Sequence, residues 1–302
     1  MSGQQVSFGI VHGFHGFDLD GLADEARHAE ALGYEFFSTP DHLHTDQPTA
    51  EPWTALTWVA AATQRLRVLP NVLGLPYRAP AVTAKMAETL DRLSGGRLVL
   101  GLGLGGYDAE FSAFGLAERT PGQKIAALRE AIQIIRGLWS EQTFSLAGEH
   151  FTVRDARIEP KPAGRIPIWL GAYGPRSLRL TGELADGWIP SIGRLGLDQA
   201  TTMRQAVLAS ARDAGRNPAE ITCATNVVVA FGDDDVAETA RAGWRQVSGG
   251  SEAIAERLAE IATAGFTVIN VAFPDPQARE RFAAEVAPVV RRELSLAGPL
   301  SQ

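Results

Sequence analysis

Short apolar runs alternate with amphipathic segments along almost the whole chain. Eight runs rich in apolar and β-branched residues begin near positions 6, 34, 66, 97, 166, 185, 221 and 266. Each is followed by a segment whose apolar residues recur at helical spacing. The segment after Thr120–Gln123 also begins with a capping box and a proline at the first helical position. Strands that alternate with helices predict a parallel sheet covered by helices.

Eight such units within 302 residues predict a (β/α)8 TIM barrel, with residues 1–302 forming a single domain. A doubly wound sheet is the structural alternative. Residues 141–165 interrupt the alternation, and Phe144–Leu146, Gly148 and Phe151–Val153 predict a small hairpin inserted into the barrel. No stretch rich in Pro, Ser or Gly divides the chain into two halves.

Composition removes several classes of function. The 35 acidic residues outnumber the 28 basic ones, and the net charge of −7 argues against a surface for nucleic acid. A single cysteine, Cys223, excludes an internal disulfide and a cysteine-based metal site. No run approaches the ~20 apolar residues of a membrane span, and the first residues lack the features of a signal peptide. We therefore expect a cytoplasmic protein that acts on a small molecule, without nucleic acid or a membrane as partner.

In a barrel of this kind the chemistry lies at the carboxyl ends of the strands. Asp41 and His42 follow the second strand and form the sharpest polar pair. Histidine exchanges protons near neutral pH, so His42 is the candidate catalytic residue. In the alternative interpretation Asp41 caps a turn and His42 only packs. The spacing of the histidines predicts no metal site.

A glycine-rich run follows the fourth strand. Gly101–Gly106 matches G-x-G-x-x-G, but the next segment, YDAEFSAFG, does not open a clean apolar-periodic helix. The dinucleotide fingerprint is therefore incomplete. We interpret Gly103, Gly105 and Gly106 as residues that let a flat ring approach the backbone. The alternative is a glycine-rich turn that binds nothing.

The loop after the fifth strand predicts a phosphate site. Its candidate residues are Gly171, Ala172, Tyr173, Gly174, Arg176 and Ser177. They open a helix, whose first N–H groups and positive dipole end attract anions, and Arg176 adds charge. The alternative is an ordinary turn between a strand and a helix.

Several stretches, in their order along the chain, resemble the luciferase-like oxidoreductases that use a flavin or a deazaflavin. They are TPDHLH, EPWTAL, LPYRAPAVTAKMAETLDRLSGGRLVLGLGLGG, EPKP, PIWLGAYGPRSLRL and ADGW. The resemblance is strongest over residues 6–190 and most specific between Pro76 and Gly106. It implies a (β/α)8 barrel with an insertion and a flavin-like ring at the carboxyl-terminal mouth.

The resemblance to the branch that uses the deazaflavin coenzyme F420 also implies roles for residues. Asp41 and His42 would lie beside the ring, and a non-proline cis peptide between Asn71 and Val72 would form a bulge behind it. The glycines of the fourth strand would run under the ring, and the loop 171–177 would take the phosphate.

One position departs from some relatives. Sugar-phosphate dehydrogenases of this branch carry a catalytic glutamate directly after the last glycine pair. Here Gly106 stands at that place and Glu110 follows a few residues on, which speaks against that substrate.

We expect an oxidoreductase that transfers a hydride between F420 and a small organic substrate with an activated C=C, C=N or carbonyl group, or an alcohol. His42 would exchange the accompanying proton. One alternative is an FMN-dependent monooxygenase that takes reduced FMN from a partner reductase and uses O₂. Another is a carrier that binds a flavin or deazaflavin without turnover. The resemblance further implies a homodimer, with an F420 or flavin reductase or dehydrogenase as an indirect partner.

Overall fold

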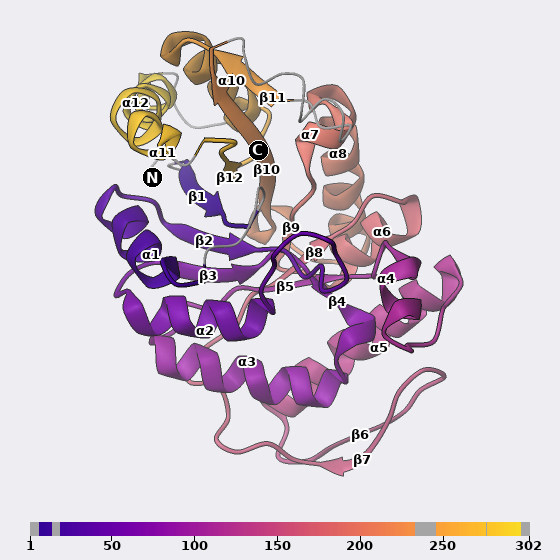
Figure 1. The fold of residues 1–302 in the computed structure, drawn as a ribbon. Coiled ribbons are helices and arrows are strands. Elements are labelled where there is room, and N and C mark those ends of the chain that lie inside the picture. Colours follow the sequence, from indigo (N-terminus) through magenta and orange to yellow (C-terminus); the bar gives the residue numbers. More distant parts are fainter. Residues whose placement is uncertain (1–5, 14–18, 233–245, 276, 297–302) are drawn as a thin grey trace.

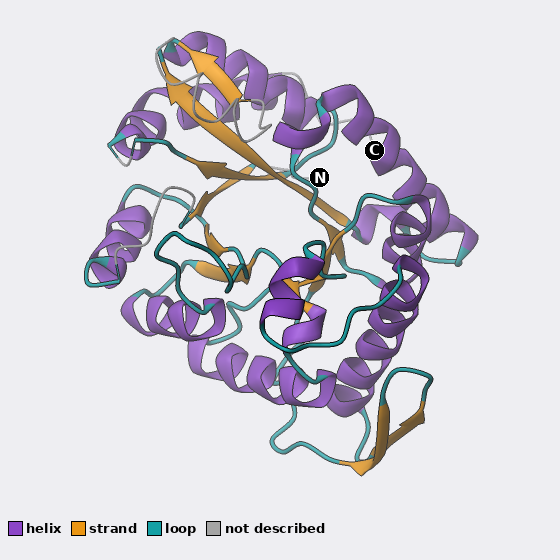
Figure 2. Ribbon diagram, turned by 45° about the vertical axis from the view of Figure 1, so that its right-hand side comes forward, coloured by secondary structure: helices purple, strands orange, loops and turns teal. Residues whose placement is uncertain are grey.

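The computed structural model describes residues 6–13, 19–232, 246–275 and 277–296. In this part of the chain a ring of parallel strands is surrounded by helices (Figures 1 and 2). The barrel strands are β1 (Ser7–Val11), β2 (Phe36–Thr39), β3 (Arg67–Pro70), β4 (Leu73–Gly74), β5 (Leu100–Gly103), β8 (Ile168–Gly171), β9 (Gly187–Trp188), β10 (Thr222–Phe231) and β12 (Val268–Ala272).

These strands pair in the order β3-β2-β1-β12-β10-β9-β8-β5-β4. A parallel bridge between Val68 of β3 and Leu98, just before β5, joins the first strand of that order to the last but one, and β4 continues the chain directly from β3. The sheet therefore closes on itself. The predicted (β/α)8 barrel is confirmed, and the alternative of an open doubly wound sheet is wrong.

Long helices pack around the barrel, as the alternating pattern predicts. They are α1 (Leu22–Ala31), α2 (Pro52–Ala62), α3 (Pro80–Ser94), α5 (Pro121–Ser140), α6 (Pro175–Leu184), α8 (Leu197–Asp213), α10 (Ser251–Thr263) and α12 (Ala287–Leu296). Shorter helical pieces are η1 (Leu75–Tyr77), α4 (Asp108–Ala113), α7 (Ile192–Leu195), η2 (Pro218–Glu220), α11 (Ala278–Arg281) and η3 (Phe282–Val286). None of the helices described is long and apolar enough to span a lipid bilayer.

The predicted insertion is an antiparallel hairpin of β6 (Phe144–Ala147) and β7 (Thr152–Ala156), which lies outside the barrel (Figure 1). Two elements differ from expectation. The strand β11 (Gln246–Gly249), which pairs with the end of β10, was not predicted. The segment after the glycine run, expected as a loop, forms α4. Its one buried residue is Phe111, and a single buried residue leaves no periodic signal in a sequence.

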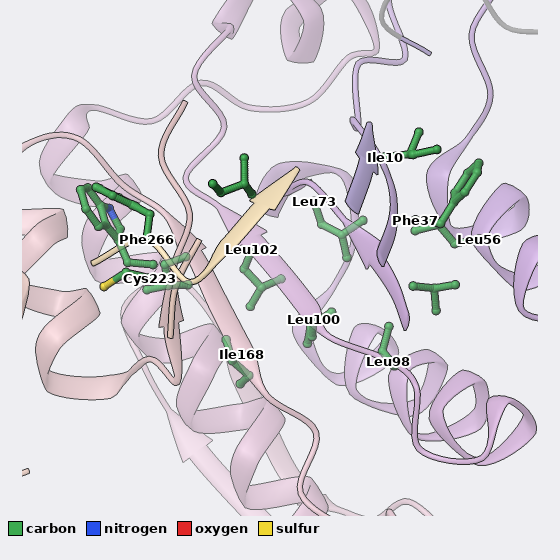
Figure 3. Packing of buried hydrophobic residues seen from close by; sticks show 14 of the residues in the cluster. Ile10, Phe37, Leu56, Leu73, Leu98, Leu100, Leu102, Ile168, Cys223 and Phe266 are labelled. Carbon is green, nitrogen blue, oxygen red and sulfur yellow. The ribbon is translucent and has the colours of Figure 1, made fainter. Parts of the chain in front are cut away.

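Alternating residues of the strands face opposite sides of the barrel wall. Leu98, Leu100 and Leu102 belong to the cluster between the strands and the helices (Figure 3). The intervening residues face the barrel axis. The inner cluster consists of Phe36, Leu69, Val99, Trp169, Ile189, Ala224 and Val268. This apolar plug closes the barrel below the site.

Gly101 has no room for a side chain, and this constraint is testable. A Cβ built on Gly101 would lie 2.0 Å from the backbone oxygen of Pro70, in the neighbouring part of the wall. We expect Gly101→Ala to lower the free energy of unfolding by about 3 kcal/mol, because backbone must shift. Urea unfolding measures the loss. Gly164→Ala is the control, since a Cβ there meets nothing within 4 Å; equal effects of the two variants would refute the packing argument.

Candidate active site

A cavity of about 550 Å³ opens at the carboxyl ends of the barrel strands. Most of the predicted site residues contribute to its wall. These are Asp41, His42, Asn71, Val72, Gly103, Gly105, Gly106, Gly171, Tyr173, Gly174 and Ser177. Ala172 and Arg176 do not line it. The size is that of pockets for drug-sized organic molecules.

The floor of the cavity is polar. Ser38, Asn71, Ser191, Asn226 and Asn270 each lie two positions after a residue of the inner apolar plug, and Asn71, Ser191 and Asn226 line the cavity. Asn71 donates to Asn226 Oδ1 over 2.7 Å, and Asn226 donates back to Asn71 Oδ1 over 3.2 Å and to Ser191 Oγ over 3.3 Å. Asn270 is fully buried, and neither polar atom of its side chain has a hydrogen-bond partner among the described residues. Amide donors and acceptors are therefore concentrated directly under the cavity.

The peptide between Asn71 and Val72 is cis, as the resemblance implies. It separates β3 from β4, which together replace the one predicted strand. The side chain of Val72 lines the cavity next to two glycines. A Cβ on Gly103 would lie 2.6 Å from Val72 Cγ2, and one on Gly171 would lie 3.0 Å from it. These two glycines therefore make room for Val72.

Gly105 and Gly106, the other two glycines interpreted as making way for a flat ring, have different surroundings. Gly105 has a φ of +80°, and its Cβ would lie 2.7 Å from Phe111 Cε2, so it admits the anchor of α4. A Cβ on Gly106 would meet nothing within 4 Å. Among the glycines interpreted as making way for a flat ring, Gly106 is thus the one with open space beside it.

Asp41 is held by the protein itself. Arg78 donates to both of its carboxylate oxygens, over 2.7 and 3.1 Å, and the backbone N–H of Gly74 donates over 2.8 Å. The side chain of Asp41 is completely buried. Its structural role is to fix the end of β2 against β4 and η1, and its predicted contact with a cofactor stays a prediction.

His42 has a carboxylate partner that the sequence did not reveal. Its Nδ1 lies 2.9 Å from Glu110 Oε1, and the hydroxyl of Tyr77 donates to Glu110 Oε2 over 3.2 Å. The ring of Tyr107 meets the imidazole edge-on at 5.1 Å between centroids. The side chain of His42 is 47% exposed and that of Glu110 only 14%. The accessible imidazole of His42 is thus in contact with the largely buried carboxylate of Glu110.

The predicted phosphate loop leads from β8 into α6. Gly174 is the N-cap and Pro175 the first residue of the helix, so the N–H groups of its first turn lack partners within the helix. Ser177 is buried and donates its hydroxyl to the Gly174 carbonyl over 2.8 Å. Arg176 is exposed, and its guanidinium lies near Gly122, at the start of α5. The role of these residues in binding phosphate remains a prediction.

No group of three His, Cys, Asp or Glu side chains suited to a metal ion occurs in the residues that the structure describes. Arg194 is the one Lys or Arg among the described residues of the cavity wall. Its guanidinium lies 6.0 Å from the centre of the Tyr107 ring. Sequence reasoning did not single out Arg194, Asn226 or Tyr77, because only the folded chain brings these residues to the site.

The family model described as luciferase-like monooxygenase matches residues 4–298. The chain belongs to the luciferase-like monooxygenase family. Within it, an F420-dependent glucose-6-phosphate dehydrogenase of Kineococcus radiotolerans is 32% identical over 240 residues, which cover 77% of this chain and 70% of the relative. A phthiodiolone/phenolphthiodiolone dimycocerosates ketoreductase of Mycobacterium bovis is 37% identical over 195 residues, 62% of this chain and 50% of that one.

Solved structures share the fold of this family member. An F420-dependent secondary alcohol dehydrogenase, in complex with an F420–acetone adduct, superposes with a TM-score of 0.85 at 19% identity, covering 95% of this chain and 99% of the other. A monooxygenase from Streptomyces bottropensis has a TM-score of 0.79 at 19% identity, with 93% and 99% coverage. The same barrel fold therefore occurs in a protein named as a dehydrogenase and in one named as a monooxygenase.

The contact between Tyr77 and Glu110 is measurable by titration. Burial, the charge of Glu110 and the hydrogen bond to it raise the pKa of Tyr77 to about 12. Glu110→Gln removes the charge but not the burial, so we expect the midpoint to fall to between about 10 and 12. Absorbance at high pH, with Tyr77→Phe subtracted to isolate this phenol, gives the value. Glu118→Gln is the control, and an unchanged Tyr77 midpoint in Glu110→Gln would contradict the contact.

Proposed function

We propose that this chain is an oxidoreductase that transfers a hydride between coenzyme F420 and a small organic substrate. The observation that carries the proposal is the accessible His42 beside a 550 Å³ cavity at the mouth of a luciferase-like barrel. Relatives named as F420-dependent dehydrogenases support the choice of cofactor.

The residues present fit such a cofactor. Val72, Ile189 and Val228 give the cavity apolar walls that suit a planar ring system, while the amides of Asn71 and Asn226 offer donors and acceptors from below. The start of α6 offers unpaired backbone N–H groups to a phosphate. When bound, F420 supplies or accepts the hydride.

The protein contributes position and a proton. The cavity holds the substrate beside His42, which exchanges the proton that balances each hydride. In the reducing direction His42 donates that proton to the substrate, and in the oxidising direction it removes the proton of the alcohol.

We further propose that the substrate is an uncharged carbonyl compound or alcohol. Among the described wall residues Arg194 is the one permanent cation, and Asp41 and Glu110 are carboxylates. A sugar phosphate carries about two negative charges near pH 7, since its second pKa is about 6. A single arginine, in a wall that also contains the Glu110 carboxylate, is a poor match for it.

Cofactor choice is tested by fluorescence titration of the purified protein with F420 and, in parallel, with FMN. We expect F420 to bind at least about tenfold more tightly, a difference of about 1.4 kcal/mol. Preference for FMN would replace the proposal by the oxygen-using monooxygenase. Binding of F420 without hydride transfer to any carbonyl, imine or activated alkene of a broad panel would instead indicate the carrier.

The homodimer is proposed on the outer faces of α2 and α3, which lie side by side (Figure 1). The helix α2 contains no charged residue, and its Trp58 is 62% exposed. On α3, Val82 and Leu93 are 55% and 74% exposed. Apolar surface of this kind is typical of an interface with another protein, here a second copy of the chain.

Light scattering should give twice the mass of one chain, and Trp58→Glu should shift it toward a monomer, because a charge would be buried in the interface. Leu296→Glu is the matched control, since Leu296 is 82% exposed on α12, outside α2 and α3. A wild-type monomer, or equal effects of both variants, would refute this interface. Cytoplasmic location and a reductase or dehydrogenase that recycles the cofactor remain predictions.

A further inference from the structure

The hydrogen bond between Glu110 and His42 bears on which nitrogen of the imidazole carries a proton. We propose that Glu110 is the positioning residue that keeps one proton on Nδ1 of His42, so that Nε2 is the nitrogen that exchanges a proton with the substrate. This inference rests on the proposed function for its chemical consequence. The arrangement of the protons, however, is a property of the protein alone.

The geometry leaves Glu110 little freedom. Oε1 faces His42 Nδ1 at 2.9 Å, and Oε2 accepts from the Tyr77 hydroxyl over 3.2 Å. Because burial and Glu110 raise the pKa of Tyr77 to about 12, this phenol keeps its proton and remains a donor throughout the physiological range. Both carboxylate oxygens are therefore occupied, and the carboxylate cannot rotate away from the imidazole without losing a bond.

The backbone explains how an acid from a different part of the chain reaches His42. Gly105 adopts a φ of +80° and leaves space for the ring of Phe111. Phe111 is buried and meets Tyr77 at 4.7 Å between ring centroids, which anchors α4 beside η1. Glu110 precedes Phe111 on the same turn of α4. The glycine thus controls the placement of the carboxylate.

The neighbouring charges do not compete for His42. Asp41, next to it in sequence, is already bound by Arg78 and the backbone of Gly74. The Arg194 guanidinium lies 6.0 Å from the centre of the Tyr107 ring, the ring that meets the imidazole edge-on. His44 meets the ring of Phe114 instead. Within the described structure, Glu110 is the acid in contact with the imidazole.

Protonation of His42 follows from this contact. An ionised carboxylate can only accept a hydrogen bond, so Nδ1 must carry a proton. In neutral His42 the lone pair is then on Nε2. When a carbonyl substrate receives the hydride at carbon, the Nε2 proton of the imidazolium moves to the carbonyl oxygen, which gives an alcohol and neutral His42. The reverse reaction returns the proton to Nε2.

The proton positions can be measured on the unmodified protein without cofactor. Long-range ¹H–¹⁵N spectra distinguish the two neutral tautomers, and loss of one signal set in His42→Asn identifies His42 among the six histidines. We expect neutral His42 to be protonated on Nδ1. In Glu110→Leu it should change to the Nε2-protonated form that water favours. Glu118→Leu is the matched control, because Glu118 is an exposed acid that bonds Ser112.

Steady-state kinetics provide a second test of the role of Glu110. Glu110→Leu and Glu110→Gln should lower kcat by about 100-fold, the lower range for acid–base catalysis, while the affinity for F420 changes little. Glu110→Asp should restore part of the rate. The inference fails if His42 carries its proton on Nε2 in the wild type, if the tautomer is the same in Glu110→Leu, or if kcat stays within a few-fold of the wild type. If F420 does not bind, the proposed function fails, whereas the tautomer result still decides the role of Glu110.

Discussion

The geometry of the site depends on one buried ion pair, that of Asp41 and Arg78. The carboxylate is completely enclosed and receives three hydrogen bonds, two from Arg78 and one from the Gly74 backbone. Arg78 also binds Glu51, whose carboxylate accepts hydrogen bonds from the backbone N–H groups of Trp53 and Thr54 at the start of α2. One arginine thus connects the end of β2, the segment after the cis peptide and the start of α2.

A buried carboxylate is unfavourable unless its lone pairs all find donors. Burial alone would lower the pKa of Arg78, but the hydrogen bonds and charges of Asp41 and Glu51 raise it above its ordinary value. The guanidinium therefore stays charged wherever the protein is folded. Because His42 directly follows Asp41, this anchor fixes the backbone of the accessible histidine. The residue proposed to exchange protons is exposed, and the residue before it is held by three hydrogen bonds.

The sequence predicted the parts of this architecture that repeat. Alternating strands and helices, the capping box at Thr120 and the inserted hairpin all carry periodic or local signals, and the structure has them. The contact of His42 with Glu110 spans 68 residues and has no local signal. The floor amides Asn71 and Asn226 are 155 positions apart, so only the closed barrel brings them together.

The glycines of residues 101–106 show that a sequence motif says less about the role of a glycine than the atoms that surround it in the fold. Gly101 faces the carbonyl of Pro70, Gly103 faces Val72, and Gly105 faces Phe111. Three glycines are thus required by three separate protein neighbours, and a fingerprint match contains none of this information. The consequence is chemical as well as structural, since the approach of Phe111 to Gly105 places Glu110 against His42. The same run that suggests a ligand beside the backbone also controls, through the ring of Phe111, where the Glu110 carboxylate lies.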